Sequence, residues 1–63
     1  MIGKLTHPVR DPRTGIVHMT GEALEIVREK VLELGTHRVL ISIRWATGTA
    51  TMLLPDDVEV IHP

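Results

Sequence analysis

The stretch TGEALEIVREKVLELG, residues 20–35, decides how the rest of the chain is arranged. Its aliphatic residues recur at the spacing of one helical face: Leu24, Val27, Val31 and Leu34. Thr20 fits an N-cap, because its hydroxyl can accept a hydrogen bond from a backbone amide of the first turn. Gly35 suits the left-handed position that ends a helix. The pattern therefore predicts one helix over about residues 21–34.

The same stretch also contains two short apolar runs, ALEIV and KVLEL, which are compatible with two strands. In a strand every second residue shares one face, so one face would mix acidic and aliphatic side chains: Glu25, Val27, Glu29, Val31 and Glu33. A helix separates the charged residues from the apolar ones. The helix is therefore preferred over the strands.

Length and composition indicate one small domain, residues 1–63, with an aliphatic core. A chain of this size buries only about 60% of the surface that it exposes when unfolded, so its fold is marginal without an additional source of stability. There is no cysteine, which excludes disulfides and thiolate metal sites. The formal net charge of −1 gives no general electrostatic attraction for nucleic acid. Self-association is the remaining way to gain stability.

Two hairpins are predicted on either side of the helix. Residues 11–15, DPRTG, form a strong turn between an extended segment, residues 7–10, and a short strand, residues 16–19. Residues 39–45, VLISIRW, are the best strand in the chain, and Ala46-Thr47-Gly48 turns it back into residues 49–54. A left-handed Gly48 sets the expected pairs as Trp45 with Thr49, Ile43 with Thr51 and Ile41 with Leu53.

The chain ends in a turn and a last strand. Pro55 ends the strand before it, Asp56-Asp57 suit a short 3₁₀ turn, and residues 58–61 form an edge strand. The predicted fold class is thus α+β, an antiparallel sheet of four to five short strands with one helix packed on one face.

The second strand hairpin is apolar on both faces. One face carries Val39, Ile41, Ile43, Trp45 and Leu53, and the other carries Leu40, Met52 and Leu54. A single helix covers only one face, so the other needs the N-terminal segment or another copy of the chain. We expect another copy, with Leu40, Met52 and Leu54 at the interface of a homo-oligomer.

The last third, RWATGTATMLLPDDVEVI, resembles the end of SH3-like small barrels of the Tudor type. The resemblance rests on Arg44-Trp45, Gly48, Pro55 and residues 58–61, which match an aromatic strand end, a glycine turn, a proline and a last short strand. It implies an SH3-like all-β barrel as the alternative fold. The helical pattern of residues 20–35 departs from it. Trp45 is the only aromatic residue, so no Tudor-type aromatic cage is expected.

Candidate ligand-binding residues are mainly arginines, which suit bidentate recognition of carboxylate or phosphate. The set is Arg10, Arg13, Arg38 and Arg44, with His37 and Trp45 beside them. Trp45 is either a core residue or an interface anchor. His7 and His18, on the two arms of the first hairpin, are weak metal candidates with Asp11; surface histidines are the simpler interpretation, and no metal is predicted.

The sequence favours a small non-enzymatic interaction or ligand-binding module that works as a homo-oligomer. One alternative is an SH3-like nucleic-acid or peptide binder, which needs the arginines on one face. Another is an enzyme whose site forms only at an oligomer axis. We expect no cofactor, no membrane contact, a cytoplasmic location and, if there is a ligand, a small anionic one; nucleic acid is not favoured.

Overall fold

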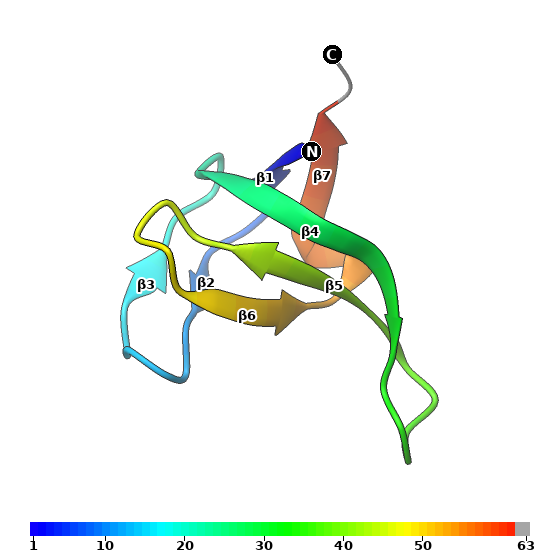
Figure 1. Cartoon of the computed structure of the whole chain (residues 1–63). Helices are drawn as coiled ribbons and strands as arrows, with labels where there is room; N and C mark the ends of the chain where they lie inside the picture. The colour runs from blue at the N-terminus through cyan, green and yellow to red at the C-terminus, as the bar shows by residue number, and fades with distance from the viewer. Residues whose placement is uncertain (62–63) are drawn as a thin grey trace.

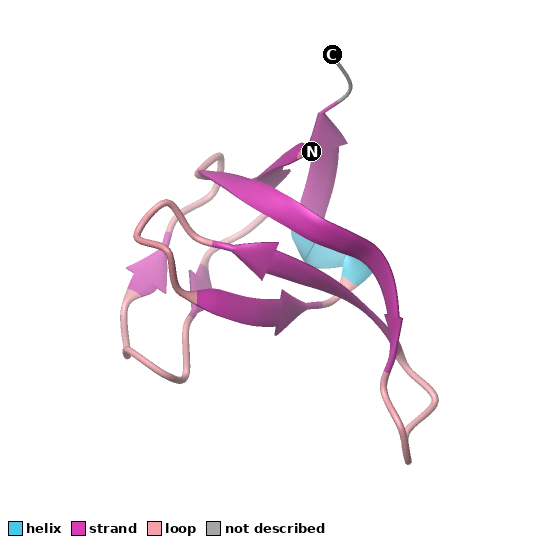
Figure 2. Ribbon diagram, viewed as in Figure 1, coloured by secondary structure: helices cyan, strands magenta, loops and turns pink. Residues whose placement is uncertain are grey.

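The computed structural model describes residues 1–61, and these residues form strands and one short 3₁₀ turn (Figures 1 and 2). The elements follow one another as β1 (Ile2–Leu5), β2 (Val9–Arg10), β3 (Val17–His18), β4 (Ala23–Leu32), β5 (Val39–Arg44), β6 (Ala50–Leu53), η1 (Pro55–Asp57) and β7 (Val58–Ile61). Here η1 is the 3₁₀ turn.

Five strands form one antiparallel sheet in the order β6-β5-β4-β1-β7. The first and last strands of the chain are neighbours, with Gly3 opposite Val60. β2 and β3 pair only with each other and form a separate β2–β3 hairpin, which we define as residues 9–18.

The predicted helix is wrong, and with it the α+β fold class: residues 20–35 contain β4, and no helix packs on the sheet within residues 1–61. The two glycines that flank the stretch do adopt positive φ, Gly21 at 87° and Gly35 at 92°, but they serve turns on either side of a strand. Thr20 lies in the turn before β4 rather than at a helix N-cap.

Two β-bulges explain why the alternation argument failed. The register between β4 and β5 shifts once between Ile26 and Arg28 and again between Arg28 and Val31. Each shift inserts an extra residue, so the face that a given side chain occupies changes along the strand. Leu24 and Ile26 point inward by regular alternation, and the charged residues after them are exposed. The bulges therefore keep Glu25, Val27, Glu29 and Val31 from sharing one face, and Glu33 lies outside β4.

The core lies on the inner face of the curved sheet. Its buried side chains come from five strands and from the residue after β5: Leu5, Leu24, Ile26, Ile41, Ile43, Trp45, Leu53 and Val58. Val9, from the β2–β3 hairpin, packs against this cluster. Gly3 is required by close packing, because a Cβ there would meet Val58 Cγ1 at 2.7 Å. The core is aliphatic apart from Trp45, as the composition predicted.

Several local predictions are confirmed. Val9 pairs with His18 in the first hairpin, and Ile41 pairs with Leu53 in the second. Gly48 has φ of 94° and Trp45 N–H donates to Thr49 O, as the three-residue loop required. Residues Pro55–Asp57 form the 3₁₀ turn and Val58–Ile61 the last strand.

The all-β class is also the class of the alternative fold. Residues 1–61 contain no helix that is long and apolar enough to cross a membrane.

Candidate functional site

The β2–β3 hairpin is fixed to the core by an aromatic stack. The imidazole of His18 lies on the indole of Trp45, with ring centroids 3.6 Å apart and planes inclined by only 2°. His18 Nδ1–H donates to Glu22 Oε2 at 2.5 Å, because a carboxylate oxygen can only accept. Trp45 is 2% exposed, which resolves its role: it is a core residue.

Asp11 organises the turn of this hairpin from a buried position. It is 1% exposed, and its Oδ1 accepts a hydrogen bond from the Arg13 amide at 2.9 Å. Gly15 N–H donates to Asp11 O at 2.7 Å, and Gly15 has φ of 75°, which explains the glycine there. Two buried polar atoms have no partner within residues 1–61, Asp11 Oδ2 and Trp45 Nε1. The hairpin is therefore a packed element with a rigid turn.

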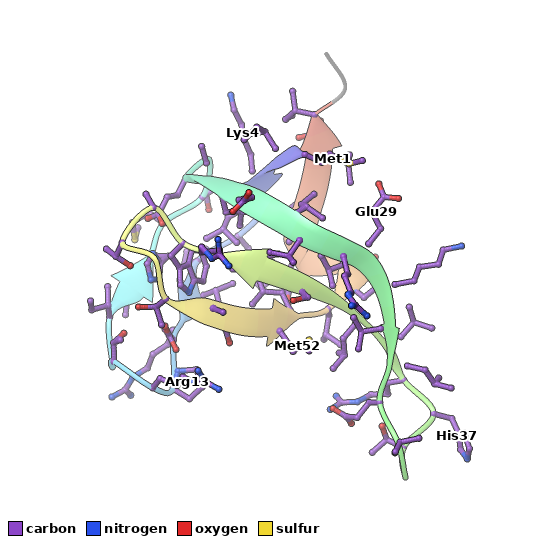
Figure 3. The ribbon with its side chains drawn as sticks, viewed as in Figure 1. Met1, Lys4, Arg13, Glu29, His37 and Met52 are labelled. Carbon is purple, nitrogen blue, oxygen red and sulfur yellow. The ribbon has the colours of Figure 1, made fainter. Side chains whose placement is uncertain are left out.

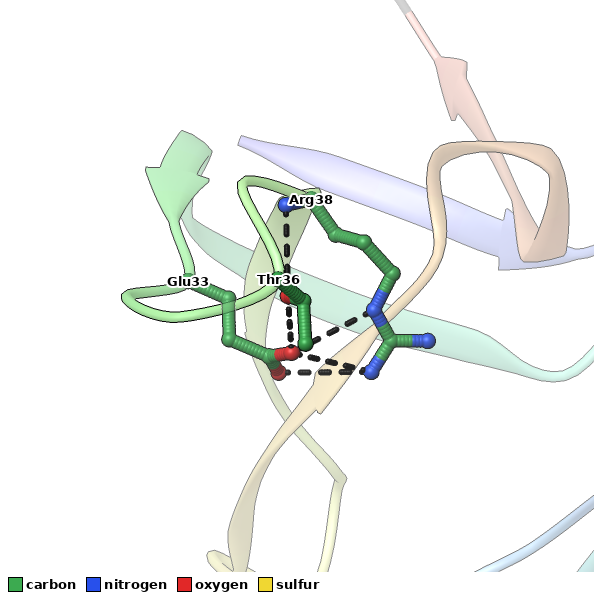
Figure 4. A network of polar contacts seen from close by, with 3 residues as sticks. All are labelled: Glu33, Thr36 and Arg38. Carbon is green, nitrogen blue, oxygen red and sulfur yellow. Dashed lines mark hydrogen bonds and ion pairs between the residues drawn. The ribbon is translucent and has the colours of Figure 1, made fainter.

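A further hairpin projects away from the rest of the molecule (Figure 1). It consists of the end of β4, the start of β5 and the loop between them. We call residues 31–40 the projecting arm. Its loop is held by polar contacts between three side chains (Figure 4). Glu33 Oε1 accepts hydrogen bonds from Thr36 Oγ1 at 2.5 Å and from Arg38 Nη2 at 3.1 Å. His37 adopts a positive φ of 57° at the end of this loop.

These contacts lower the pKa of Glu33. The hydrogen bond from Thr36 is the largest cause and the hydrogen bond from Arg38 the next, because both favour the ionised carboxylate. The network is exposed to solvent, so it fixes the loop conformation more than it stabilises the fold.

Three apolar side chains of the projecting arm are exposed, although Leu40 at its end is buried. Leu32 and Val39 form a cross-strand pair, and both are about half exposed. Leu34, in the loop, is 90% exposed. The arm therefore presents three aliphatic side chains around a loop whose backbone is fixed.

The structure does not bring the predicted ligand-binding residues together. Arg38 is bound to Glu33 in the arm, and Arg44 Nη1 lies 3.5 Å from Glu25 Oε1 on the outer face of the sheet. Arg10 and Arg13 belong to the β2–β3 hairpin. Figure 3 shows Arg13 and His37 on opposite sides of the molecule. Binding by any of these residues stays a prediction.

The two weak metal candidates each contact a different carboxylate. His7 Nε2 contacts Asp57 Oδ1, whereas His18 Nδ1 contacts Glu22. Over residues 1–61, no group of three or more His, Cys, Asp or Glu side chains is placed to hold a metal ion. The fourth histidine, His62, lies outside the described residues.

The predicted interface residues differ in accessibility. Leu40 is 8% exposed, because the chain itself covers it, so it is not available to a partner in this conformation. Met52 and Leu54 are 48% and 42% exposed. Only Met52 and Leu54 of the three predicted residues are therefore open to contact.

Sequence reasoning missed the projecting arm. The helix prediction puts Leu34 on a buried apolar stripe, and the strand prediction puts Val39 on an apolar face of the sheet. The available signal was the run Val31-Leu32 followed by Leu34 and Gly35, which is apolar but ends in a turn. Which of these residues is buried depends on the bulges in β4, and these have no clear sequence pattern.

Comparison with known proteins gives no family for this chain. No family model matches it, and no curated protein and no solved structure matches it significantly.

Proposed function

We propose that this protein is a small, non-enzymatic interaction module that works as a homo-oligomer, with the projecting arm as its contact surface. The observation that carries the proposal is Leu34, 90% exposed on a loop whose backbone is fixed, beside the exposed pair Leu32 and Val39. Aliphatic side chains held in this way offer a preorganised surface, since little conformational entropy is lost when they are buried by a partner.

The balance of apolar residues supports self-association. Within residues 1–61, eleven large hydrophobic residues are exposed and nine hydrophobic residues are buried. A two-fold contact places the same surface of two copies together, so one apolar arm supplies both sides of the interface. Glu33 and Arg38 form an ion pair within one arm, so the arms of two copies can approach each other without leaving either charge unpaired.

The experiment is light scattering over a dilution series, with Leu34→Ser as the test variant. Burial of a leucine contributes about 1.5–3 kcal/mol, so its loss raises the dissociation constant at least about tenfold. Met19→Ser is the control, because Met19 is also exposed and lies outside the arm. A wild-type protein that stays monomeric at high micromolar concentration rejects the proposal. Equal effects of the two variants would move the interface away from the arm.

The four arginines do not gather on one face, because Arg38 and Arg44 form ion pairs with Glu33 and Glu25 elsewhere in the fold. The second candidate function is therefore a narrower one, an SH3-like peptide binder. The observation in its favour is the order of elements: five antiparallel strands, a hairpin between β1 and β4, and a 3₁₀ turn before a last strand that returns to β1. A peptide that binds a monomeric form of the chain would rank this function first. The enzyme alternative and the cytoplasmic location remain predictions, to be tested on the assembled oligomer and by cell fractionation.

A further inference from the structure

Two of the four arginines predicted to bind a ligand form ion pairs with carboxylates of this chain, and the other two form none within residues 1–61. Arg38 and Arg44 contact Glu33 and Glu25. Arg10 and Arg13 form no ion pair with any carboxylate of residues 1–61. Both lie in the β2–β3 hairpin, separated by only two residues, Asp11 and Pro12. Arg10 and Arg13 are therefore the two predicted arginines that stay available to a ligand, and they lie close together in the sequence.

Both side chains are exposed at the turn end of this hairpin. Arg10 pairs with Val17 across the hairpin, whereas Val9 and His18 form the pair that faces the core. The Arg10 guanidinium reaches the turn, because its Nη2 would lie 3.9 Å from a Cβ at Gly15. Arg13 is exposed, and its backbone amide is held by Asp11.

The one carboxylate between the two arginines is out of reach of a ligand. Asp11 is 1% exposed, with Oδ1 bonded to the Arg13 amide and Oδ2 unpartnered but buried. Arg10, Asp11 and Arg13 together carry a formal net charge of +1, on a chain whose formal net charge is −1. A ligand therefore meets guanidinium groups first.

Apolar side chains adjoin this charge. Ile16 and Val17 are each about half exposed, and Met19 follows them with 60% exposure. A small inorganic anion would contact only the guanidinium groups. A peptide that carries both acidic and aliphatic side chains would contact the guanidinium groups and bury this apolar surface as well.

From this arrangement we propose that the outer face of the β2–β3 hairpin binds an acidic, extended segment of a partner protein. Arg10 and Arg13 bind its carboxylates, and Ile16 and Val17 contact its aliphatic side chains. Nucleic acid is the weaker fit, because the formal net charge of the chain is negative. The inference does not depend on self-association, since Arg13 and the arm residue His37 lie on opposite sides of the molecule (Figure 3).

The test is fluorescence anisotropy with a labelled peptide of alternating glutamate and leucine. The same peptide with glutamine for glutamate, and an oligothymidine, serve as the other two probes. We expect the acidic peptide to bind and the Arg10→Gln/Arg13→Gln double variant to bind it about tenfold or more weakly, because charge-assisted hydrogen bonds are lost. Arg28→Gln is the matched control, since Arg28 is also exposed and forms no ion pair within residues 1–61.

Three results would overturn the proposal: no binding of the acidic peptide, equal binding of the glutamine peptide, or equal loss in Arg28→Gln. Tighter binding of oligothymidine that depends on the same two arginines would replace it with a nucleic-acid surface. The emission of Trp45, which stacks on His18 in this hairpin, reports whether each variant keeps the fold. Light scattering on the same samples shows whether self-association has changed, so failure here and failure of the oligomer proposal are distinguishable.

Discussion

The β2–β3 hairpin and the projecting arm are both ordered, but different contacts order them. The β2–β3 hairpin turns one face to the core, where Val9 packs and His18 stacks on Trp45. No residue of the projecting arm belongs to the core cluster, although Leu40 at the end of the arm is buried. Its loop is fixed by polar contacts among Glu33, Thr36 and Arg38.

The difference shows that a fixed backbone does not imply buried side chains. In the β2–β3 hairpin, burial and order arise together, because the same residues provide both. In the arm, order comes from exposed hydrogen bonds, which contribute little to global stability. The arm is thus free to present aliphatic side chains to a partner. The first hairpin presents only its outer face.

Replacement of Trp45 is the largest perturbation that this comparison predicts. Trp45→Ala removes a 2% exposed indole and the surface on which His18 stacks. Loss of a buried aromatic side chain costs about 3–5 kcal/mol, a large part of the stability of a domain this small. We expect the variant to be mostly unfolded by circular dichroism in urea titrations. Leu32→Ala, in the arm, is the control, and its midpoint should hardly move at a protein concentration low enough to keep the chain monomeric. A similar loss in both variants would mean that the arm belongs to the core.

Turns and short strands were predictable from the sequence because they depend on neighbouring residues. The DPRTG turn and Gly48 each determine a local backbone geometry, and each forms as expected. The position of Trp45 in the strand register followed from Gly48. Its stack with His18 did not, because it joins residues far apart in the chain that share no pattern.

The helix prediction failed because helical propensity and strand pairing were in competition. Glu, Leu, Lys and Arg favour helices, and their spacing here fits one helical face. In this chain, residues 23–32 pair with β1 on one side and β5 on the other, so the tertiary environment overrides propensity. The bulges at Ile26–Arg28 and Arg28–Val31 then remove the expected alternation. The wrong helix prediction also put Leu34 on a buried stripe, so the exposed arm and the candidate interface were missed.

A smaller loss of stability is expected when the β2–β3 hairpin loses its contact with the core. His18→Ala removes the stack on Trp45 and the hydrogen bond to Glu22, and we expect a loss of about 1–3 kcal/mol. Trypsin is the sharper probe, since Arg10 and Arg13 lie in this hairpin and cleavage there should accelerate. His37→Ala, in the arm, should leave cleavage at Arg10 and Arg13 unchanged. Unchanged cleavage in His18→Ala would show that the stack does not hold the hairpin.

The smallest effect concerns pH and should be confined to the arm. The pKa of Glu33 is lowered from its ordinary value of 4.5, first by the hydrogen bond from Thr36 and then by Arg38. A folded pKa below the unfolded one means that the network contributes above about pH 4.5 and is lost as pH falls through the lowered value. Amide chemical shifts of Thr36 and Arg38 should therefore change below pH 4.5, while that of Ile43, a fully buried core residue, stays constant. Glu33→Gln should abolish this titration. If the shifts of the arm and the core moved together, the arm would not be an independently ordered element, and the contrast between the two hairpins would fail.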